Sequence, residues 1–529
     1  MDVSARRGCS AICAWDCRAF LNYEGFAQVK GKCVVTWAVR YHLVVDDIGR
    51  IGEESRQPVK SDCKRVCLVA LVLVLFVPYA CAANPATDRG YREEPDFYID
   101  LENIAEIVRE LASEKYAGRL PGTPGNWAAV EYVADYFGQL GLDCPEGLDR
   151  YLQFCIQPVR MLGRAPVLEI LDEAGNVMSD FSYVQQYAPA PKQGWMVCKE
   201  VVGEGVVLKS LSHINEIEDG KILLIPRSIS ENAADMYILF TRLNWREEED
   251  APRFAGMIME TDISETGYFP VYGLVSRDVE FQDRDAHTSP GPLIFKCDVG
   301  VFSKLVKASE QGHRIRMDWN FAVQDVAAAN VVAVLPGPDG QVSGDYVIIG
   351  AHIDHMGSNM DGTYNPGAMD NASGVAAMME IARLLSEAED RPRRAVVFIA
   401  LNGEEEGMWG SRHYAQNPCY PLGESVMINI DNIGSKHDVP LVIEEYAMML
   451  TRIVYHLYGI ALQHGIDVEM CSGSMCDNAS FALAGIEAVS LVDPDYSYGF
   501  HGPADTPDRV DPRRIGRIID VILNYLYTY

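Results

Sequence analysis

Residues 346–374, YVIIGAHIDHMGSNMDGTYNPGAMDNASG, decide the fold of this chain. The uninterrupted apolar run at 347–349 is typical of a parallel strand that is buried on both faces. It leads to His352, and a glycine-rich loop then delivers Asp370 just before a helical pattern. In open α/β sheets the functional groups lie beyond the carboxyl ends of such strands, so His352 and Asp370 are candidate metal ligands.

Three further apolar runs, at 395–401, 426–430 and 488–492, are followed by the same kind of residue. The residues after these runs are Glu404, Glu405, Glu406, Asp431 and His501. Imidazole and carboxylate groups are zinc ligands, and a catalytic zinc keeps a position open for water. Asp370, Glu405 and Asp431 would repel one another without a metal, so the charge count favours two zinc ions.

Five ordered motifs carry a resemblance to a known family. They are AHIDH (351–355), GAMDNASG (367–374), NGEEEGMWGS (402–411), MINIDNIG (427–434) and FHGPADTPDRVD (500–511). Together they resemble the dizinc exopeptidases of the M28 metallopeptidase family, whose relatives include aminopeptidases and glutamate carboxypeptidases. The resemblance implies an α/β fold, a three-layer sandwich with a mostly parallel mixed sheet of the phosphorylase/hydrolase-like type.

The same resemblance assigns roles to the candidate residues. It implies that His352 and Asp431 bind one Zn²⁺, that Glu405 and His501 bind a second, that Asp370 bridges the two, and that Glu404 is the general base. It also implies a cis peptide bond after Asp370. Taken singly, each motif has an ordinary structural reading, such as helix capping for GAMDNASG or a solvated loop for the three glutamates. All five in order are hard to explain in that way.

Other residues are expected to support the ligands. Asp354 is predicted to accept the second imidazole N–H of His352, as metal-bound histidines usually require. We interpret His355 as a neighbour of the site rather than a ligand. Asp477 stands where the family often has an Asp-His pair, although the next residue here is Asn478.

The oxyanion donor departs from the family pattern. Phe500 occupies the position at which many relatives have Tyr, directly before the last ligand. A phenol donor to the oxyanion is therefore either missing or supplied by Tyr496 or Tyr498.

Length and charge set limits on the class of protein. With 529 residues the chain is too long for one ordinary core. Its 75 acidic and 45 basic residues give a net charge of -30, which argues against nucleic-acid binding because phosphate contacts need a basic face.

The domain organisation follows from changes in pattern along the chain. Residues 95–180 are predicted to form the N-terminal part of the peptidase domain, with two helices within 99–142 and a strand at 151–157 that Pro158 ends. Residues 183–316 carry short β-like runs and resemble an inserted protease-associated (PA) domain. Residues 325–529 complete the peptidase domain with the metal-binding part.

The first 83 residues are predicted not to belong to the fold. Basic residues precede the apolar run at 66–77, and the small residues at 80–82 follow it, so residues 59–83 are interpreted as a secretory signal peptide. An uncleaved membrane anchor at 66–83 is the alternative, although the run is shorter than the roughly 18 residues of a membrane span. Residues 1–58 are interpreted as an extension absent from the mature protein.

These observations predict an exported zinc-dependent exopeptidase that hydrolyses peptides or small amides, with aminopeptidase as the first choice. A carboxypeptidase or another amide hydrolase would use the same dizinc site. A non-catalytic binding or receptor homologue is the alternative from another class, but that class predicts lost ligands, and all five are present.

Overall fold

A computed structural model describes most of the chain after residue 96. The described residues are 97–162, 164–189, 199–232, 236, 239, 254–261, 293–342, 345–446, 451–473, 476–495, 499 and 501–529. The predicted extension and signal peptide lie outside them. Within this part of the chain, no helix is long and apolar enough to cross a membrane.

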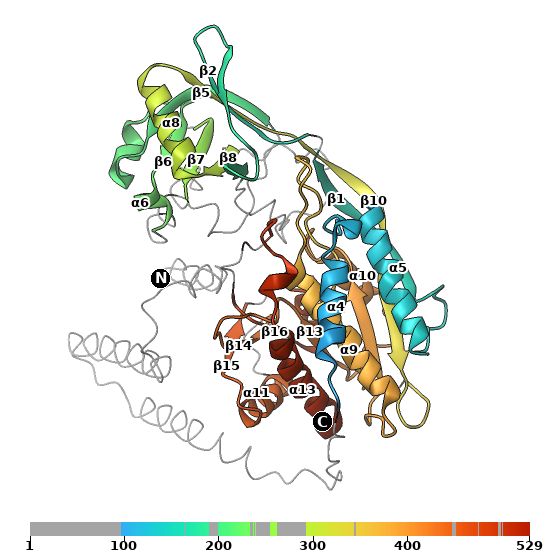
Figure 1. The fold of residues 1–529 in the computed structure, drawn as a ribbon. Coiled ribbons are helices and arrows are strands. Elements are labelled where there is room, and N and C mark those ends of the chain that lie inside the picture. Colours follow the sequence, from blue (N-terminus) through green and yellow to red (C-terminus); the bar gives the residue numbers. More distant parts are fainter. Residues whose placement is uncertain are drawn as a thin grey trace, which may run out of the picture. The chain divides into compact units, whose positions relative to one another are not determined.

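The peptidase part is built on a mixed eight-stranded sheet in the order β1-β10-β12-β11-β13-β16-β14-β15 (Figure 1). Its strands are β1 (Leu152–Leu162), β10 (Phe321–Leu335), β11 (Val347–His352), β12 (Val396–Leu401), β13 (Val426–Ile430), β14 (Leu441–Glu445), β15 (Val468–Ser472) and β16 (Glu487–Val492). The neighbours β12, β11, β13 and β16 are parallel, whereas β1, β10 and β14 run antiparallel to their neighbours nearer the centre. The apolar runs of the sequence therefore form the parallel centre of the sheet.

Helices cover both faces of this sheet, which confirms the predicted α/β sandwich. The helices and helical turns of this part are α4 (Leu101–Leu111), η2 (Glu114–Tyr116), α5 (Pro124–Gln139), η4 (Ala368–Ala372), α9 (Ser373–Glu387), α10 (Trp409–Gln416), α11 (Arg452–Gln463), α12 (Asn478–Leu483), η5 (Pro507–Arg509) and α13 (Pro512–Thr528). Along β11, Val347 and Ile349 pack with α4, α5, α9, α11 and α13, whereas Ile348 faces the other core with α10 and α12. This alternation divides the apolar run between two cores.

Gly374 brings the start of α9 close to the end of β13. A Cβ atom at this position would meet the Asn371 side chain and the carbonyl oxygen of Ile430. The Asn371 amide donates to that carbonyl at 2.8 Å and accepts from the Gly374 N–H at 3.0 Å. The contact therefore fixes α9 directly behind the loop that carries Asp370.

We expect Gly374→Ala to lower the free energy of unfolding by about 1–3 kcal/mol, because the added methyl group overpacks this contact. Gly459 in α11 is a matched control, since a Cβ atom there meets no atom of the described residues within 4 Å. Gly459→Ala should instead stabilise the protein by roughly 0.5–1 kcal/mol through helix propensity. Thermal unfolding of both variants measures these effects. Equal shifts in melting temperature would contradict the close packing at Gly374.

The inserted part forms a second eight-stranded sheet in the order β3-β2-β9-β5-β6-β7-β8-β4. Its elements are β2 (Val167–Leu171), β3 (Val177–Asp180), β4 (Tyr187–Pro189), β5 (Lys199–Val207), η3 (Leu211–Glu216), β6 (Ile222–Ile225), α6 (Arg227–Ser230), β7 (Gly256–Glu260), β8 (Leu293–Cys297), α8 (Val299–Glu310) and β9 (Arg314–Trp319). The predicted boundary at 183 is too late, because β2 and β3 pair within this sheet. A short strand shows its own pattern in the sequence but not its partner. The resemblance to a PA domain stays a prediction.

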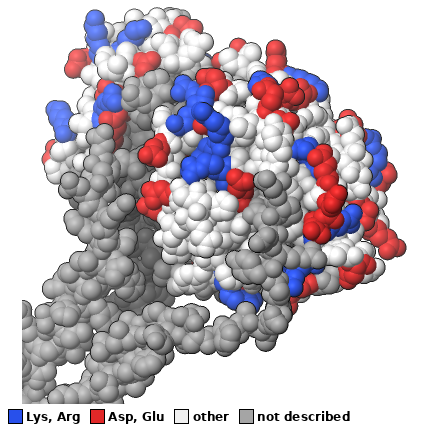
Figure 2. Space-filling view, turned by 60° about the horizontal axis from the view of Figure 1, so that its bottom comes forward, with Lys and Arg blue, Asp and Glu red and all other residues white. Residues whose placement is uncertain are grey.

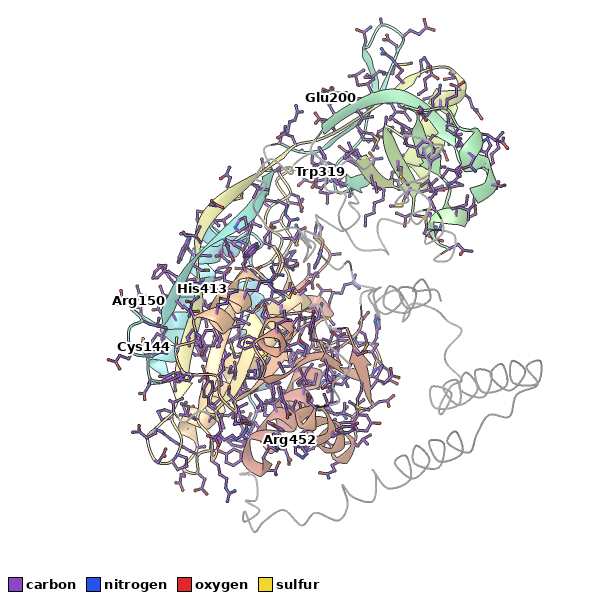
Figure 3. The ribbon with its side chains drawn as sticks, turned by 180° about the vertical axis from the view of Figure 1, so that it is seen from behind. Cys144, Arg150, Glu200, Trp319, His413 and Arg452 are labelled. Carbon is purple, nitrogen blue, oxygen red and sulfur yellow. The ribbon has the colours of Figure 1, made fainter. Side chains whose placement is uncertain are left out.

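Strands β1 and β10 connect the two sheets along the chain, and β1 is longer than predicted. Pro158 lies opposite Asp325 inside the ladder, and pairing continues to Leu162 opposite Phe321. Pro is tolerated here because β1 is an edge strand of the sheet. In Figure 3, Glu200 and Trp319 label β5 and β9 of the inserted sheet, while His413 labels α10 of the peptidase part.

The surface carries charges of both signs. Figure 2 shows acidic and basic side chains interspersed over the coloured part of the face that it presents.

Candidate metal centre

The parallel strands position the candidate ligands, because their carboxyl ends meet at one edge of the sheet. The residues at or after these ends are His352 at β11, Glu404, Glu405 and Glu406 after β12, Asp431 after β13 and His501 after β16. Asp370 comes from η4, in the loop that follows β11, and its peptide bond to Asn371 is cis, as the resemblance implied.

Asp370 lies between two imidazole rings. Its Oδ1 atom is 3.2 Å from Nε2 of His352, and its Oδ2 atom is 2.9 Å from Nε2 of His501. His352 Nε2 is also 3.4 Å from Asp431 Oδ1, and His501 Nε2 is 3.2 Å from Glu405 Oε2. The five predicted ligands therefore form two groups that share Asp370, and all five are buried.

The donor atoms of these groups fit divalent cations. Zinc bonds to imidazole nitrogen and carboxylate oxygen measure about 2.0–2.2 Å, so ligand atoms on one ion lie some 3 Å or more apart. The carboxylates in and around the groups are Asp354, Asp370, Glu404, Glu405, Asp431, Asp477 and Asp505. Arg119 is a buried cation beside them. Two divalent ions would offset much of the remaining negative charge.

The electrostatics of the cluster favour positive charge at the imidazole nitrogens. Burial alone would lower the pKa of His352, but Asp431 and Asp370 raise that pKa well above its usual range. Burial alone would raise the pKa of Asp370, yet hydrogen bonds from His352 and His501 hold it well below its usual range. A metal ion competes with protons at the same nitrogens.

Glu404 differs from the five buried residues because part of its surface is accessible. Burial of the carboxyl group, followed by the charges of Asp431 and Asp477, raises the pKa of Glu404 well above its usual range, although His352 opposes the shift. Its oxygen atoms are within 4.8 Å of ligand atoms of His352 and Glu405. A carboxylate that is accessible, beside both groups and easily protonated can exchange a proton with a bound molecule.

Asp354 supports the site in a different way from the prediction. His352 Nδ1 is 3.2 Å from the backbone oxygen of Asp354 and 3.8 Å from its Oδ1 atom, so the carbonyl is the nearer acceptor. The carboxylate instead accepts the backbone N–H groups of Gly403, Glu404 and Glu405, at 2.7, 3.2 and 3.2 Å. It therefore holds the loop that carries both glutamates. The spacing of the motif placed Asp354 correctly but did not reveal its acceptor role.

Arg119 and Asp505 were missed by the sequence analysis. The Arg119 guanidinium donates to the carbonyl oxygens of Leu111, Ile353, Pro366 and Gly367, at 2.6–2.8 Å. Burial lowers its pKa to about 10. These bonds hold the loop between His352 and Asp370.

Asp505 fixes the same loop from the other side. Its carboxylate accepts the backbone N–H groups of Met369 and Asp370, at 2.9 and 3.1 Å. Burial raises the pKa of Asp505 to about 7, and the hydrogen bond from Met369 opposes the shift. The only signals in the sequence were an Arg in a Gly- and Pro-rich loop and an Asp within the last motif.

The structure describes Asp477 but not the candidate oxyanion donors. Asp477 is buried at the start of α12, where burial raises its pKa to about 7 and the charge of His352 opposes the shift. Tyr496 and Tyr498, the candidate oxyanion donors, lie outside the described residues, as does Phe500.

Glu406 forms a buried ion pair with Arg160 of β1. Its Oε2 atom accepts the backbone N–H, Nε and Nη2 of Arg160 at 3.2, 2.9 and 2.8 Å. The two side chains are only 4% and 8% exposed. Glu406 therefore connects the loop of the glutamates to the edge of the sheet.

We expect Glu406→Gln to destabilise the protein by about 3 kcal/mol, because it removes one charge of a buried ion pair. Zinc content should not change. Glu387→Gln is the control, since Glu387 pairs with Arg383 but is 61% exposed, and such a pair contributes about 0–1 kcal/mol. Chemical denaturation measures both, and a Glu406 variant as stable as the control would contradict the prediction.

Comparisons with known proteins place part of the chain among zinc peptidases by similarity. Residues 330–526 match the model of peptidase family M28. A relative from Pyrenophora teres f. teres, described as a probable zinc metalloprotease, is 33% identical over 141 residues, which are 24% of this chain and 30% of the relative. Aminopeptidase YwaD of Bacillus subtilis is 27% identical over 199 residues, 35% of this chain and 41% of the relative. The matched regions thus span less than half of either relative.

Two solved structures share the fold. BSAP, a zinc aminopeptidase from Bacillus subtilis, has a TM-score of 0.54 at 18% identity, covering 82% of this chain and 96% of that one. An aminopeptidase from Aneurinibacillus sp. has a TM-score of 0.51 at 20% identity, covering 81% and 93%. Residues 330–526 thus match peptidase family M28, and the α/β architecture of the chain is that of these aminopeptidases.

Proposed function

We propose that the chain is a zinc-dependent exopeptidase that holds two zinc ions and acts as an aminopeptidase. The observation that carries the proposal is the position of Asp370 between Nε2 of His352 and Nε2 of His501, at 3.2 and 2.9 Å. One zinc is assigned to His352 and Asp431, the other to Glu405 and His501, and Asp370 is the shared ligand. The names of the M28 relatives support zinc and aminopeptidase activity.

In this proposal, some residues bind the zinc ions and Glu404 transfers the proton during hydrolysis. When bound, the two ions would lower the pKa of a water molecule and polarise the carbonyl of the substrate. Glu404 accepts the proton of the attacking water and returns it to the amine that leaves. Its partial exposure lets it reach the substrate. Asp354 keeps Glu404 in place through the loop backbone.

Metal analysis and a set of blocked substrates test this proposal. We expect two zinc ions per chain and hydrolysis of free dipeptides and aminoacyl-p-nitroanilides. An acetyl group on the substrate amine should abolish turnover, whereas a carboxamide at the other end should not. The reverse pattern would assign a carboxypeptidase. Full zinc content without turnover of any peptide or amide would favour a binding protein.

We also propose that the chain is exported through the segment at 59–83, on the basis of its basic, apolar and small-residue pattern alone. Expression of the full chain in a secreting host should yield an extracytoplasmic protein whose first residue lies near 83. Retention of residues 66–83 in a membrane fraction would favour the anchor instead.

A further inference from the structure

His355 is a fully buried histidine next to the metal centre that has no role in the proposed function. Its Nδ1 atom is 2.9 Å from Glu405 Oε1, and its Nε2 atom has no hydrogen-bond partner among the residues that the structure describes. The other oxygen of Glu405, Oε2, faces His501 Nε2 at 3.2 Å. The Glu405 carboxylate is therefore held between two imidazole rings, one at each oxygen.

We infer that His355 is a positioning residue that occupies Oε1 of Glu405 and leaves only Oε2 for the second metal. The inference rests on the proposed function. An ionised carboxylate only accepts hydrogen bonds, so Nδ1 of His355 must carry the proton in this contact. A neutral ring then has a bare lone pair at Nε2, which costs less in a dry site than an N–H group without an acceptor.

The ring is held in this orientation by its surroundings. The backbone N–H of His355 donates to the Arg119 carbonyl at 3.4 Å, and the ring edge lies against Gly367, where a Cβ atom would clash with it. The His355 and His501 rings pack edge to face, with 5.7 Å between their centroids and 71° between their planes. The ring thus has little freedom to release Glu405.

Direct ligation by His355 fits the distances less well. Its Nδ1 atom is 4.0 Å from Asp370 Oδ2, whereas His501 Nε2 is 2.9 Å from the same oxygen. His355, Asp370 and Glu405 also offer ligand atoms within 4.8 Å of one another. However, His501 presents one nitrogen closely to both carboxylates of the second group, whereas His355 Nδ1 lies close to Glu405 Oε1 alone. An Nδ1–H group that donates to a carboxylate cannot bind a metal at the same time.

Two substitutions separate a hydrogen-bond donor from a ligand. Asn can place its amide N–H near the position of Nδ1 but is a poor zinc ligand, whereas Leu removes the donor and keeps volume. We expect His355→Leu to weaken the second zinc by about 10- to 100-fold, the range seen when groups that orient ligands are removed. His355→Asn should stay within a few-fold of the natural protein, and the first zinc should be unaffected in both.

Competition with a chromophoric chelator measures both zinc affinities, and the visible absorption of the Co²⁺-substituted protein reports the coordination of the second site without any assay of activity. His413→Leu, at a partly exposed histidine of α10 (Figure 3), is the matched control and should change neither readout.

The outcomes are distinct. Loss of one whole zinc in both His355 variants would make His355 a ligand, and unchanged affinity in the Leu variant would remove its role; either overturns the inference. If His355→Leu does not fold, His355→Asn still decides, because a ligand role predicts a lost zinc there and a donor role does not. A natural protein without two zinc ions would instead overturn the proposed function.

Discussion

Replacement of Glu404 by Gln is expected to lower kcat by at least about 10²-fold while both zinc ions remain bound. Gln has the shape of Glu but cannot accept the proton of the attacking water. Glu404 is the partly exposed carboxylate beside both metal groups, and its oxygens are not the ones that approach His352 Nε2 or His501 Nε2 most closely. Single-turnover rates together with zinc content measure the effect.

The adjacent glutamates provide the controls for this prediction. Glu405→Gln should weaken the second zinc, because Oε2 of Glu405 faces His501 at 3.2 Å. Glu406→Gln should lower stability rather than turnover, because Glu406 is engaged by Arg160. If the Glu406 variant lost turnover and the Glu404 variant kept it, the assignment of the base would be wrong.

Removal of zinc should abolish activity completely and lower the melting temperature by roughly 5–10 °C. A free zinc concentration of 1,000 times the Kd stabilises the folded chain by about 4 kcal/mol for each site. Without the ions, the carboxylates around Asp370 also repel one another. Acidification should have the same effect, because protons displace the metals from His352 and His501 as the pH falls. Activity assays and calorimetry, before and after exhaustive chelation and again after re-addition of Zn²⁺, measure the changes in activity and melting temperature.

Asp370→Asn extends this test with a single atom change. Because Asp370 contacts both histidines, its loss should weaken both sites together, whereas Asp431→Asn should weaken only the first. Activity that survives complete chelation, or an Asp370 variant that loses one metal alone, would contradict the shared-ligand arrangement.

The sequence predicted those features that depend on short stretches of chain. The runs that became β11, β12, β13 and β16 are apolar over their whole length because both faces are buried, and each is followed by its ligand. The five candidate ligands lie close together in the structure. Because these four strands are parallel, their carboxyl ends lie at the same edge of the sheet.

Features that depend on distant partners were not predictable in the same way. Pro158 breaks a central strand but is tolerated in β1, and the sequence does not show that β1 is an edge. The strand at Val167–Leu171 pairs with β9, almost 150 residues later, so its sheet could not be assigned from its own pattern. Asp354 and Arg119 act on backbone groups, which every residue has, and no sequence pattern marks those partners.

Arg119 and Asp505 both bind the loop that carries Asp370, so this loop can reach its final structure only after both residues have been synthesised. Asp505 is made about 390 residues after Arg119, which at roughly 5–20 residues per second means some 20–80 s of translation. Until then the loop of Asp370 lacks its carboxylate clamp, and His501 has not yet been added. A nascent chain that ends before His501 therefore lacks two groups of the proposed zinc site, so the proposed hydrolysis requires translation beyond Asp505.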